Sequence, residues 1–411
     1  MHSNRSTTGH NLSIFQIFFM SLKNETRQAF QNTRNFYREY TKGMTAERIG
    51  KEFQDDSRRL MELYYDAVGL KPGEKEKKQP PVRVFKLLSS LLLRLTPARR
   101  LALGFSFVAF VIHFLWSGPV AALMLPLGIL TLVLLLLLEL LEKSDVMKEI
   151  DLARDIQISL LPGSNIKHRN LEFASFASTA SEVGGDYVDV VNTDEGTYYV
   201  IADVSGKGLS ASLYMVRLQA LVHLIIEKLK PDPKELFLHL NDYIKSGKKD
   251  KTFVTACAAF FPADGSSVKM CRAGHNPPLL YQASRDAVSE LRSSGVGLGM
   301  TSTGVFKEHL KQLSINMQPG DNLLFYTDGL TEARNPRMEQ YDEHRLRDLF
   351  ELYGSLHATT ILSKIQIAVE EFIEGEKLVD DITFTCVHMH PEKSKILARK
   401  QSKDLQQLTS G

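Results

Sequence analysis

Cysteine is scarce in this sequence, and the cysteines present do not have the spacing of a metal site. The chain of 411 residues has three, Cys257, Cys271 and Cys386, each within an apolar, strand-like stretch. No pair has the CxxC spacing of zinc and redox motifs. We therefore expect buried, reduced thiols, as in a cytosolic domain, and no metal site built on cysteine.

Excess charge is also small, since the formal net charge is only +2. This balance gives no sign of a nucleic-acid partner. The charge is uneven, however, because residues 1–100 carry 19 Lys and Arg against 10 Asp and Glu. A secretory signal is not evident either: the apolar stretch Leu12–Met20 is short and has polar flanks.

Two enzyme signatures are present only as fragments. The GKG of residues 206–208 is not followed by Ser or Thr and lacks the preceding glycine spacing, so we exclude a phosphate-binding P-loop. The tripeptide GGD at 184–186 begins the GGDEF motif of diguanylate cyclases but continues as Tyr-Val-Asp. The missing Glu-Phe pair argues against that enzyme class.

A long run without charge divides the chain. No Asp, Glu, Lys or Arg occurs from Leu101 to Leu138, whereas about 20 apolar residues suffice to cross a bilayer. The tetrapeptide Trp-Ser-Gly-Pro at 116–119 is a natural turn. We predict a transmembrane hairpin over 99–140, with helices at 99–116 and 119–140. A re-entrant hairpin and a buried soluble hairpin are the alternatives.

The basic residues around this run predict its orientation. Arg94, Arg99 and Arg100 precede the first span, and positive residues stay on the cytoplasmic side. We therefore expect a multi-pass protein of the cell inner (cytoplasmic) membrane with both the N-terminus and residues 142–411 in the cytoplasm. Upstream we expect a helical region and linker over 1–80 and an amphipathic segment over 82–98 that contacts membrane lipid.

A connector follows the spans. In residues 142–162 the side chains of Val146, Ile150, Ala153, Gln157 and Leu160 repeat with four-three spacing, which places one narrow stripe on a helix. We predict a connector helix that ends at Pro162 and forms a parallel homodimer. Packing of this helix against its own domain is the alternative. The polar end of the chain, 391–411, is predicted to be a flexible tail.

Two aspartates are predicted to face each other in the next part of the chain. Residues 186–191 and 198–203 are strand-like and are separated by NTDEGT, which is rich in turn formers. If Asp194 and Glu195 form the tip, the register places Asp186 opposite Asp203. Carboxylates that close repel each other unless a cation lies between them.

Two further acidic sites follow the same logic. Asp328 ends the buried-strand pattern LLFYT, and Asp380 opens a β-rich run. In antiparallel sheets the end of one strand adjoins the start of its neighbour, so these aspartates can converge with Asp186 and Asp203. Oxygen ligands without His or Cys favour Mg²⁺ or Mn²⁺ over zinc.

These residues carry a family resemblance. The stretches SEVGGDYVDV, IADVSGKGLSASL, RAGHNPPLLY, LLFYTDGLTEA and DDITFTCV occur in this order. The set resembles the SpoIIE-like (RsbU-type) branch of the PPM, or type 2C, metal-dependent Ser/Thr protein phosphatases. The resemblance implies an α+β fold over 165–390, an αββα sandwich of two antiparallel sheets flanked by helices, with two divalent metal ions, Mn²⁺ or Mg²⁺, at one end.

The resemblance also implies roles for individual residues. Asp203 bridges both metals, the Val204 carbonyl adds a ligand, Asp186 serves one metal, and Asp328 and Asp380 serve the other. Secondary candidates are Asp381 in an orienting role, Asp189 in a largely structural role, the turn-forming pair His275 and Asn276 with a possible substrate contact, and Gly329.

The implied reaction is hydrolysis of phosphoserine or phosphothreonine on a protein, of the anti-sigma-factor-antagonist kind. Two close divalent ions make hydroxide available near neutral pH, and the CxxxxxR signature of phosphatases with a covalent nucleophile is absent. The alternative is a non-catalytic signalling module with the same fold. We further hypothesise that the connector 142–162 controls activity by shifting the elements beside Asp203 and Asp328.

Overall fold

The computed structural model describes residues 50, 53, 57, 61, 88–89, 91–93, 95–246, 252–265 and 267–391. The predicted region 1–80, much of the amphipathic segment 82–98 with Arg94, and all but the first residue of the tail 391–411 therefore lie outside the described residues or are described only at isolated positions. The chain divides into two units, Met1–Leu140 and Leu141–Gly411.

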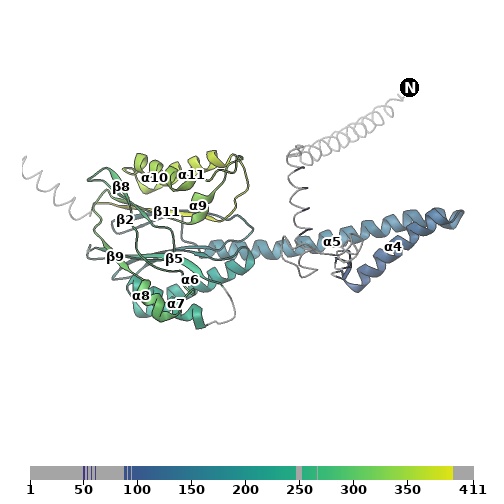
Figure 1. Cartoon of the computed structure of the whole chain (residues 1–411), viewed down its shortest axis with the longest axis horizontal. Coiled ribbons are helices and arrows are strands. Elements are labelled where there is room, and N and C mark those ends of the chain that lie inside the picture. The colour runs from purple at the N-terminus through teal and green to yellow at the C-terminus, as the bar shows by residue number, and fades with distance from the viewer. Residues whose placement is uncertain are drawn as a thin grey trace, which may run out of the picture. The chain divides into compact units, whose positions relative to one another are not determined.

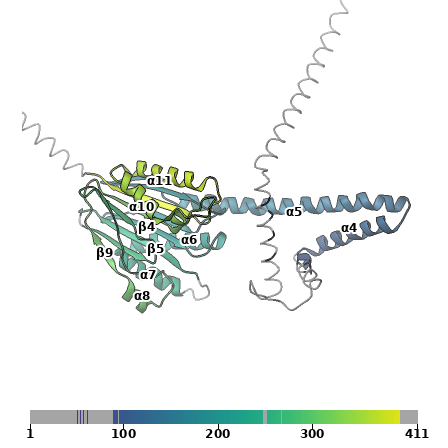
Figure 2. The same cartoon turned by 45° about the horizontal axis from the view of Figure 1, so that its top comes forward.

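The second unit contains two antiparallel sheets with helices on their outer faces (Figures 1 and 2). The first sheet has the order β1-β2-β11-β10-β7-β8. Its strands are β1 Asn165–His168, β2 Leu171–Ser178, β7 Leu279–Gln282, β8 Ala287–Glu290, β10 Asn322–Tyr326 and β11 Ile382–Met389. The second sheet has the order β3-β4-β5-β6-β9. Its strands are β3 Asp186–Asn192, β4 Gly196–Val204, β5 Val254–Pro262, β6 Val268–Ala273 and β9 Gln312–Ile315.

Each sheet is covered by its own helical layer. The helices over the second sheet are α6 Leu209–Leu229, α7 Pro233–Ser246 and α8 Thr303–His309. Those over the first sheet are α9 Asp328–Glu332, α10 Asp342–Tyr353 and α11 Ala358–Ile373. Three layers of apolar side chains result, one between the sheets and one under each helical layer. The predicted αββα sandwich is therefore confirmed.

Alternation along the strands explains these layers. On β4, Tyr199 and Ile201 lie between the sheets, whereas Tyr198 and Val200 lie under the helices. The Tyr199 ring contacts Phe325 of the facing sheet, with ring centroids 4.4 Å apart. Because both faces of β4 are buried, its sequence is continuously apolar rather than alternating.

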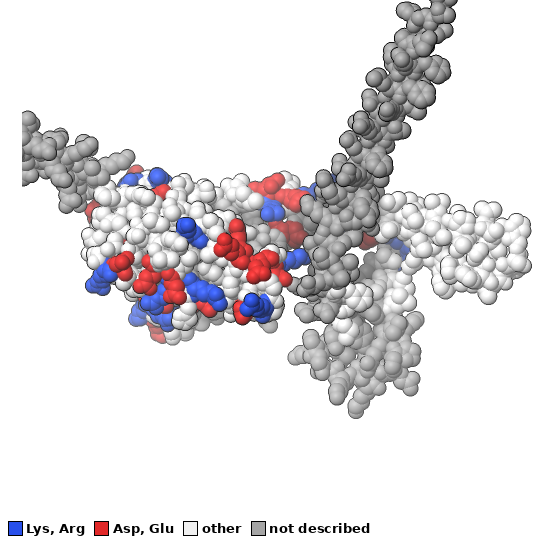
Figure 3. Space-filling view, turned by 90° about the horizontal axis from the view of Figure 1, so that it is seen from above, with Lys and Arg blue, Asp and Glu red and all other residues white. Residues whose placement is uncertain are grey.

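The first unit contains a helical hairpin, as predicted. Helix α4, Pro97–Leu115, and the first part of α5, Pro119–Leu160, are joined across the predicted turn. Arg99 forms an ion pair with Glu139 at 2.8 Å. The start of α4 and the end of the apolar part of α5 therefore lie side by side. The face of the hairpin seen in Figure 3 is almost free of charged side chains.

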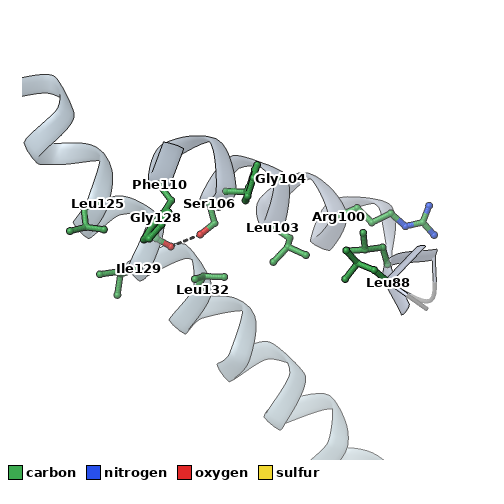
Figure 4. A pocket seen from close by; sticks show the side chains of 12 residues that line it. Leu88, Arg100, Leu103, Gly104, Ser106, Phe110, Leu125, Gly128, Ile129 and Leu132 are labelled. Atoms are coloured by element: carbon green, nitrogen blue, oxygen red, sulfur yellow. Dashed lines mark hydrogen bonds between the residues drawn. The ribbon is translucent and has the colours of Figure 1, made fainter. Parts of the chain in front are cut away.

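A close contact between small residues joins the two helices. The buried Ser106 hydroxyl donates to the Gly128 carbonyl at 2.7 Å (Figure 4). A Cβ on Gly128 would lie 3.4 Å from Cβ of Ala109, so a small residue permits this approach. An apolar pocket of about 740 Å³ lies beside the contact. It is lined by residues such as Leu103, Phe107, Phe110, Ile129 and Leu132.

Helix α5 continues across the boundary between the predicted hairpin and the predicted connector. The second hairpin helix and the connector were expected as separate elements, 119–140 and 142–162, but α5 runs without a break to Leu160. No Pro or Gly occurs between Gly128 and Pro162, and residues 139–160 are mostly good helix formers, so nothing interrupts the helix.

Among the residues that the structure describes, three helices are long and apolar enough to cross a membrane: α4, α5 and α6. Helix α6 is accounted for within the folded unit, because Met215, Val222 and Ile226 are buried against the second sheet. The hairpin helices have no such cover in the described residues: only 11% of the most apolar window of each is buried.

Candidate metal centre

The hairpin β3–β4 has the predicted register. Asp194 and Glu195 form its tip, Val191 pairs with Tyr198, and Asp186 pairs with Asp203 at the open end. The two carboxylates are therefore attached to directly opposed backbone positions. Directly opposed residues have Cβ atoms only about 4.5–5.5 Å apart.

Asp186 is buried among groups that fix its carboxylate. Its side chain is 9% exposed, and the Thr327 hydroxyl donates to its Oδ2 at 2.9 Å. Burial raises the pKa of Asp186 well above its usual value, and the neighbouring charge of Asp203 raises it further. The Thr327 hydrogen bond partly offsets these effects, and added positive charge would stabilise the anion further.

Asp203 lies at the centre of the acidic cluster. Burial raises its pKa to about 7, and the negative charges of Asp328, Asp380 and Asp381 act in the same direction, whereas Lys207 opposes them. These aspartates come from two other places in the sequence, yet each is close enough to disfavour ionisation of Asp203. The predicted convergence is thus present in the structure.

The strand order explains how Asp328 and Asp380 reach this edge. Strands β10 and β11 are antiparallel neighbours, with Tyr326 paired to Phe384. Asp328 follows the end of β10 as the first residue of α9, and Asp380 precedes the start of β11. Burial raises the pKa of Asp328, and the charges of Glu332 and Asp380 add to this effect.

The donor set fits hard divalent cations. It consists of carboxylates that repel one another, of which Asp186 is buried, without His or Cys. This is the chemistry that Mg²⁺ and Mn²⁺ prefer. No three of the described carboxylates bring ligand oxygens within 4.8 Å of one another. The Lys207 ammonium instead lies 2.9 Å from Asp380 Oδ2 and supplies positive charge there. Binding of an ion would therefore require these carboxylates to close in and Lys207 to move away from Asp380.

Asp381 fastens the loop before Asp186. Its Oδ1 accepts from the Ala180 amide at 2.8 Å, and its Oδ2 accepts from the Gly185 amide at 2.6 Å. The same loop is held from the other side by the buried Gln157 of α5. The Gln157 amide donates to the Gly184 carbonyl at 2.7 Å and accepts from the Gly184 amide at 3.1 Å.

Glycines permit the close approach of these segments. A Cβ on Gly329 would lie 1.9 Å from the Asp381 carbonyl oxygen, and a Cβ on Gly184 would lie 2.6 Å from Asp381 Oδ2. Real Cβ atoms do not come that close to backbone or carboxylate oxygen. The GG and DG pairs of the sequence therefore bring three chain segments together around Asp186.

Two other predicted residues occupy different positions. The Val204 side chain is buried in the core, and its carbonyl oxygen would lie 3.0 Å from a Cβ on Gly185, so this carbonyl faces the loop before Asp186. Asp189 lies on the other face of β3. It accepts from the Tyr187 hydroxyl at 2.8 Å and contacts His223 Nε2 of α6 at 2.5 Å, which is a structural role.

His275 lies inside the protein. Its side chain is 2% exposed, its Nδ1 lies 3.0 Å from the Thr255 hydroxyl, and its Nε2 has no hydrogen-bond partner. Burial lowers the pKa of His275 to about 3, so the ring is neutral near pH 7 and cannot donate a proton as imidazolium. Asn276 is half-buried in the turn that follows.

Several residues of the site were missed by the sequence analysis. Thr327, Lys207 and Gln157 each contact a predicted aspartate or its loop over 27 to 172 residues of chain. Thr327 could have been found, because it directly precedes Asp328 at the end of a buried strand. Gln157 is part of the four-three stripe of the connector, but neither its contact with Gly184 nor that of Lys207 with Asp380 leaves a local signal in the sequence.

The close approach at Gly329 makes a testable prediction. Gly329→Ala forces apart the backbone at Asp381, and overpacking of this kind costs about 1–3 kcal/mol. We expect the thermal unfolding midpoint of the unit 141–411 to fall by several degrees, roughly 2–4 °C per kcal/mol. Gly304→Ala is the matched control, because nothing lies within 4 Å of its Cβ. Equal midpoints for the two variants would contradict the packing described.

Comparisons with known proteins agree with this fold. Residues 193–390 match the family Stage II sporulation protein E (SpoIIE). Among curated proteins, phosphoserine phosphatase RsbU of Bacillus subtilis is 26% identical over 206 residues, covering 50% of this chain and 60% of that protein. Protein IcfG of Synechocystis sp. is 26% identical over 267 residues, covering 58% of this chain and 41% of that protein. The chain thus spans well under two thirds of either relative.

A solved structure shows the same fold. The SiaA-PP2C domain of Pseudomonas aeruginosa aligns with a TM-score of 0.52 at 16% identity, covering 60% of this chain and 98% of that domain. The family match includes Asp203, Asp328 and Asp380, and Asp186 lies just before its first residue. Residues 193–390 are thus similar to the SpoIIE family and to a phosphoserine phosphatase, and the solved structure shows the same αββα fold.

Proposed function

We propose that this protein is a membrane-anchored, metal-dependent protein serine/threonine phosphatase. One observation carries the proposal: the opposed pair of the buried Asp186 and the half-buried Asp203 lies at the sheet edge where Asp328 and Asp380 also gather. The relatedness to a phosphoserine phosphatase supports the same activity. The substrate class is a phosphoserine or phosphothreonine on a signalling protein of the anti-sigma-factor-antagonist kind.

The residues divide the work between binding and orientation. Asp203 would contact two Mn²⁺ or Mg²⁺ ions, Asp186 and the Val204 carbonyl would serve one of them, and Asp328 and Asp380 would serve the other. Bound ions of this type activate water and neutralise charge on a phosphoryl group.

The surrounding residues keep this arrangement in place. The Thr327 hydroxyl donates a hydrogen bond to one carboxylate oxygen of Asp186. This bond fixes the orientation of the carboxylate and so the direction of its other oxygen. Asp381 positions the loop before Asp186 through two backbone amides. The neutral, buried His275 shapes the turn before Pro277 rather than moving a proton.

The activity can be tested with a phosphoserine peptide and Mn²⁺. Asp203→Asn and Asp328→Asn remove charge from the cluster, and we expect each to lower kcat/KM on the order of 100-fold or more, as loss of a group that stabilises transition-state charge does. Asp194→Asn is the matched control, because it changes the opposite end of the same hairpin.

The alternative is a binding module with a phosphatase fold and no turnover. It predicts no phosphate release from the wild-type protein with Mn²⁺ and any phosphopeptide, and unchanged partner binding in Asp203→Asn. Phosphate release that is lost in both site variants and kept in Asp194→Asn excludes this alternative. Equal release from all four proteins would contradict the proposed site.

The hairpin α4–α5 is proposed as the membrane anchor. Helix α4 has 19 residues, and the part of α5 from Pro119 to Glu139 has 21, so each helix is about 30 Å long within the apolar run. The ion pair of Arg99 with Glu139 marks the side at which the chain enters and returns. With Arg100 beside it, this side is the cytoplasmic one.

Cysteine labelling in intact cells tests this topology. Ser117→Cys, in the exposed turn, is expected to react with a membrane-impermeant maleimide added outside, whereas Ser144→Cys reacts only after permeabilisation. The native cysteines are buried and give no background. Labelling of both positions from the same side would rule out the hairpin topology.

We also propose that α5 controls the site through Gln157. Its side chain is 5% exposed and forms two hydrogen bonds with Gly184, two residues before Asp186. At the C-terminal end of the connector, the helix thus packs against its own domain, which is the alternative to the predicted homodimer. Val146, at the other end, is exposed and remains available for the proposed homodimer.

Replacing Gln157 tests whether α5 affects turnover when the metal site is saturated. Gln157→Ala leaves the Gly184 amide and carbonyl without partners, which costs about 1–3 kcal/mol for each buried group. We expect kcat to fall at saturating Mn²⁺ while the unfolding transition stays cooperative. Gln366→Ala, at a hydrogen bond within α11, is the control. Wild-type kcat in Gln157→Ala would refute the proposal.

A further inference from the structure

Three histidines meet at the opposite end of β11 from the aspartates. His357, His388 and His390 each offer a ring nitrogen, and these atoms lie within 4.8 Å of one another, the single such group among the described residues. The ring centroids of His388 and His390 are 4.5 Å apart, and that of His357 is 5.2 Å and 5.6 Å from them. Nothing in the phosphatase proposal uses this cluster.

The protonation pattern of His388 is fixed by its neighbour on β10. The Asn322 amide nitrogen donates to the carbonyls of Gly354 and Leu356, at 2.7 Å and 3.0 Å, which fixes the orientation of the amide. The Asn322 oxygen must therefore accept from His388 Nδ1, 3.1 Å away. Nδ1 carries the hydrogen, and Nε2 of this buried ring has a free lone pair.

His390 is held in a similar way by a carboxylate. Its Nε2 lies 3.1 Å from Oε2 of Glu172, whose side chain is only 3% exposed. The carboxylate accepts, so Nε2 carries the hydrogen and Nδ1 keeps its lone pair. A histidine whose second nitrogen is bound by a carboxylate or an amide oxygen is the arrangement found at most metal-binding histidines.

His357 completes the group from a different segment. It is the N-cap residue of α11, and its carbonyl accepts from the amides of Thr360 and Ile361, which fixes the backbone. The side chain is exposed and can reach an ion from the solvent side. The cluster therefore joins the turn before α11 to the end of β11.

The cluster is separate from the aspartate site. His388 is six residue steps along the extended strand from Ile382, which is roughly 20 Å at about 3.3 Å per residue. The donor chemistry also differs, because imidazole nitrogens suit Zn²⁺ and similar transition metals, whereas carboxylates suit Mg²⁺.

We propose that His357, His388 and His390 bind one divalent transition-metal ion, Zn²⁺ by preference, through three ring nitrogens, with the fourth position open to water. Three protein ligands and one solvent position form a tetrahedral site of known type. Such an ion fastens α11 to the sheet at the end remote from the aspartates. Because its ligands are all imidazoles, it binds independently of Asp186 and Asp203.

Cobalt is the probe, since Co²⁺ in a tetrahedral nitrogen site gives intense visible absorption. The full chain, without a polyhistidine tag, is stripped with EDTA in detergent and titrated with Co²⁺ in excess Mg²⁺, which occupies the carboxylates. We expect one equivalent of Co²⁺ with tetrahedral absorption, displaced by one equivalent of Zn²⁺. The thermal midpoint should rise when Zn²⁺ is added.

Variants assign the ion to the cluster. His357→Ala changes an exposed side chain and should weaken Co²⁺ binding at least tenfold, because loss of even an outer-sphere partner costs about 10–100-fold. His344→Ala, an exposed histidine of α10, and Asp203→Asn should bind as the wild type does. The proposal is overturned if the wild type shows no tetrahedral absorption, if His357→Ala binds normally, or if Asp203→Asn alone removes the signal.

Discussion

The repulsion between Asp186 and Asp203 is the constraint on which the rest of this site depends. The hairpin register sets the two carboxylates opposite each other, and burial makes their charges costly. A fold that only required stability would place apolar side chains there, since buried like charges oppose folding. Keeping them implies a positively charged ligand, and the oxygen donors select a hard divalent one.

The surrounding structure can be understood as support for that pair. Asp186 and Asp203 both belong to the second sheet, whereas Thr327 and Asp381, which hold Asp186 and its loop, adjoin strands of the first sheet. The site therefore lies where the two sheets face each other, and any relative movement of the sheets changes the spacing of the carboxylates. Gln157 attaches α5 to the same loop, which provides a physical route from the connector to the site.

Much of this arrangement could be predicted from the sequence, because its signals are local. The turn formers at 192–197 fix the register of β3 and β4, and the uncharged run fixes the hairpin. The missed features arise from contacts between distant segments. Lys207 reaches Asp380 across 173 residues, and His357 meets His388 only because α11 folds back over the sheet. The break expected near Leu141 is absent since no helix-breaking residue lies there.

The most direct test of the central claim is anomalous X-ray scattering from crystals of the protein grown with Mn²⁺. The account predicts two manganese peaks between the sheets, with Asp203 contacting both, Asp186 on one side, and Asp328 with Asp380 on the other. Lys207 should then lie away from Asp380. Saturating Mn²⁺ with no peak among these carboxylates would contradict the account.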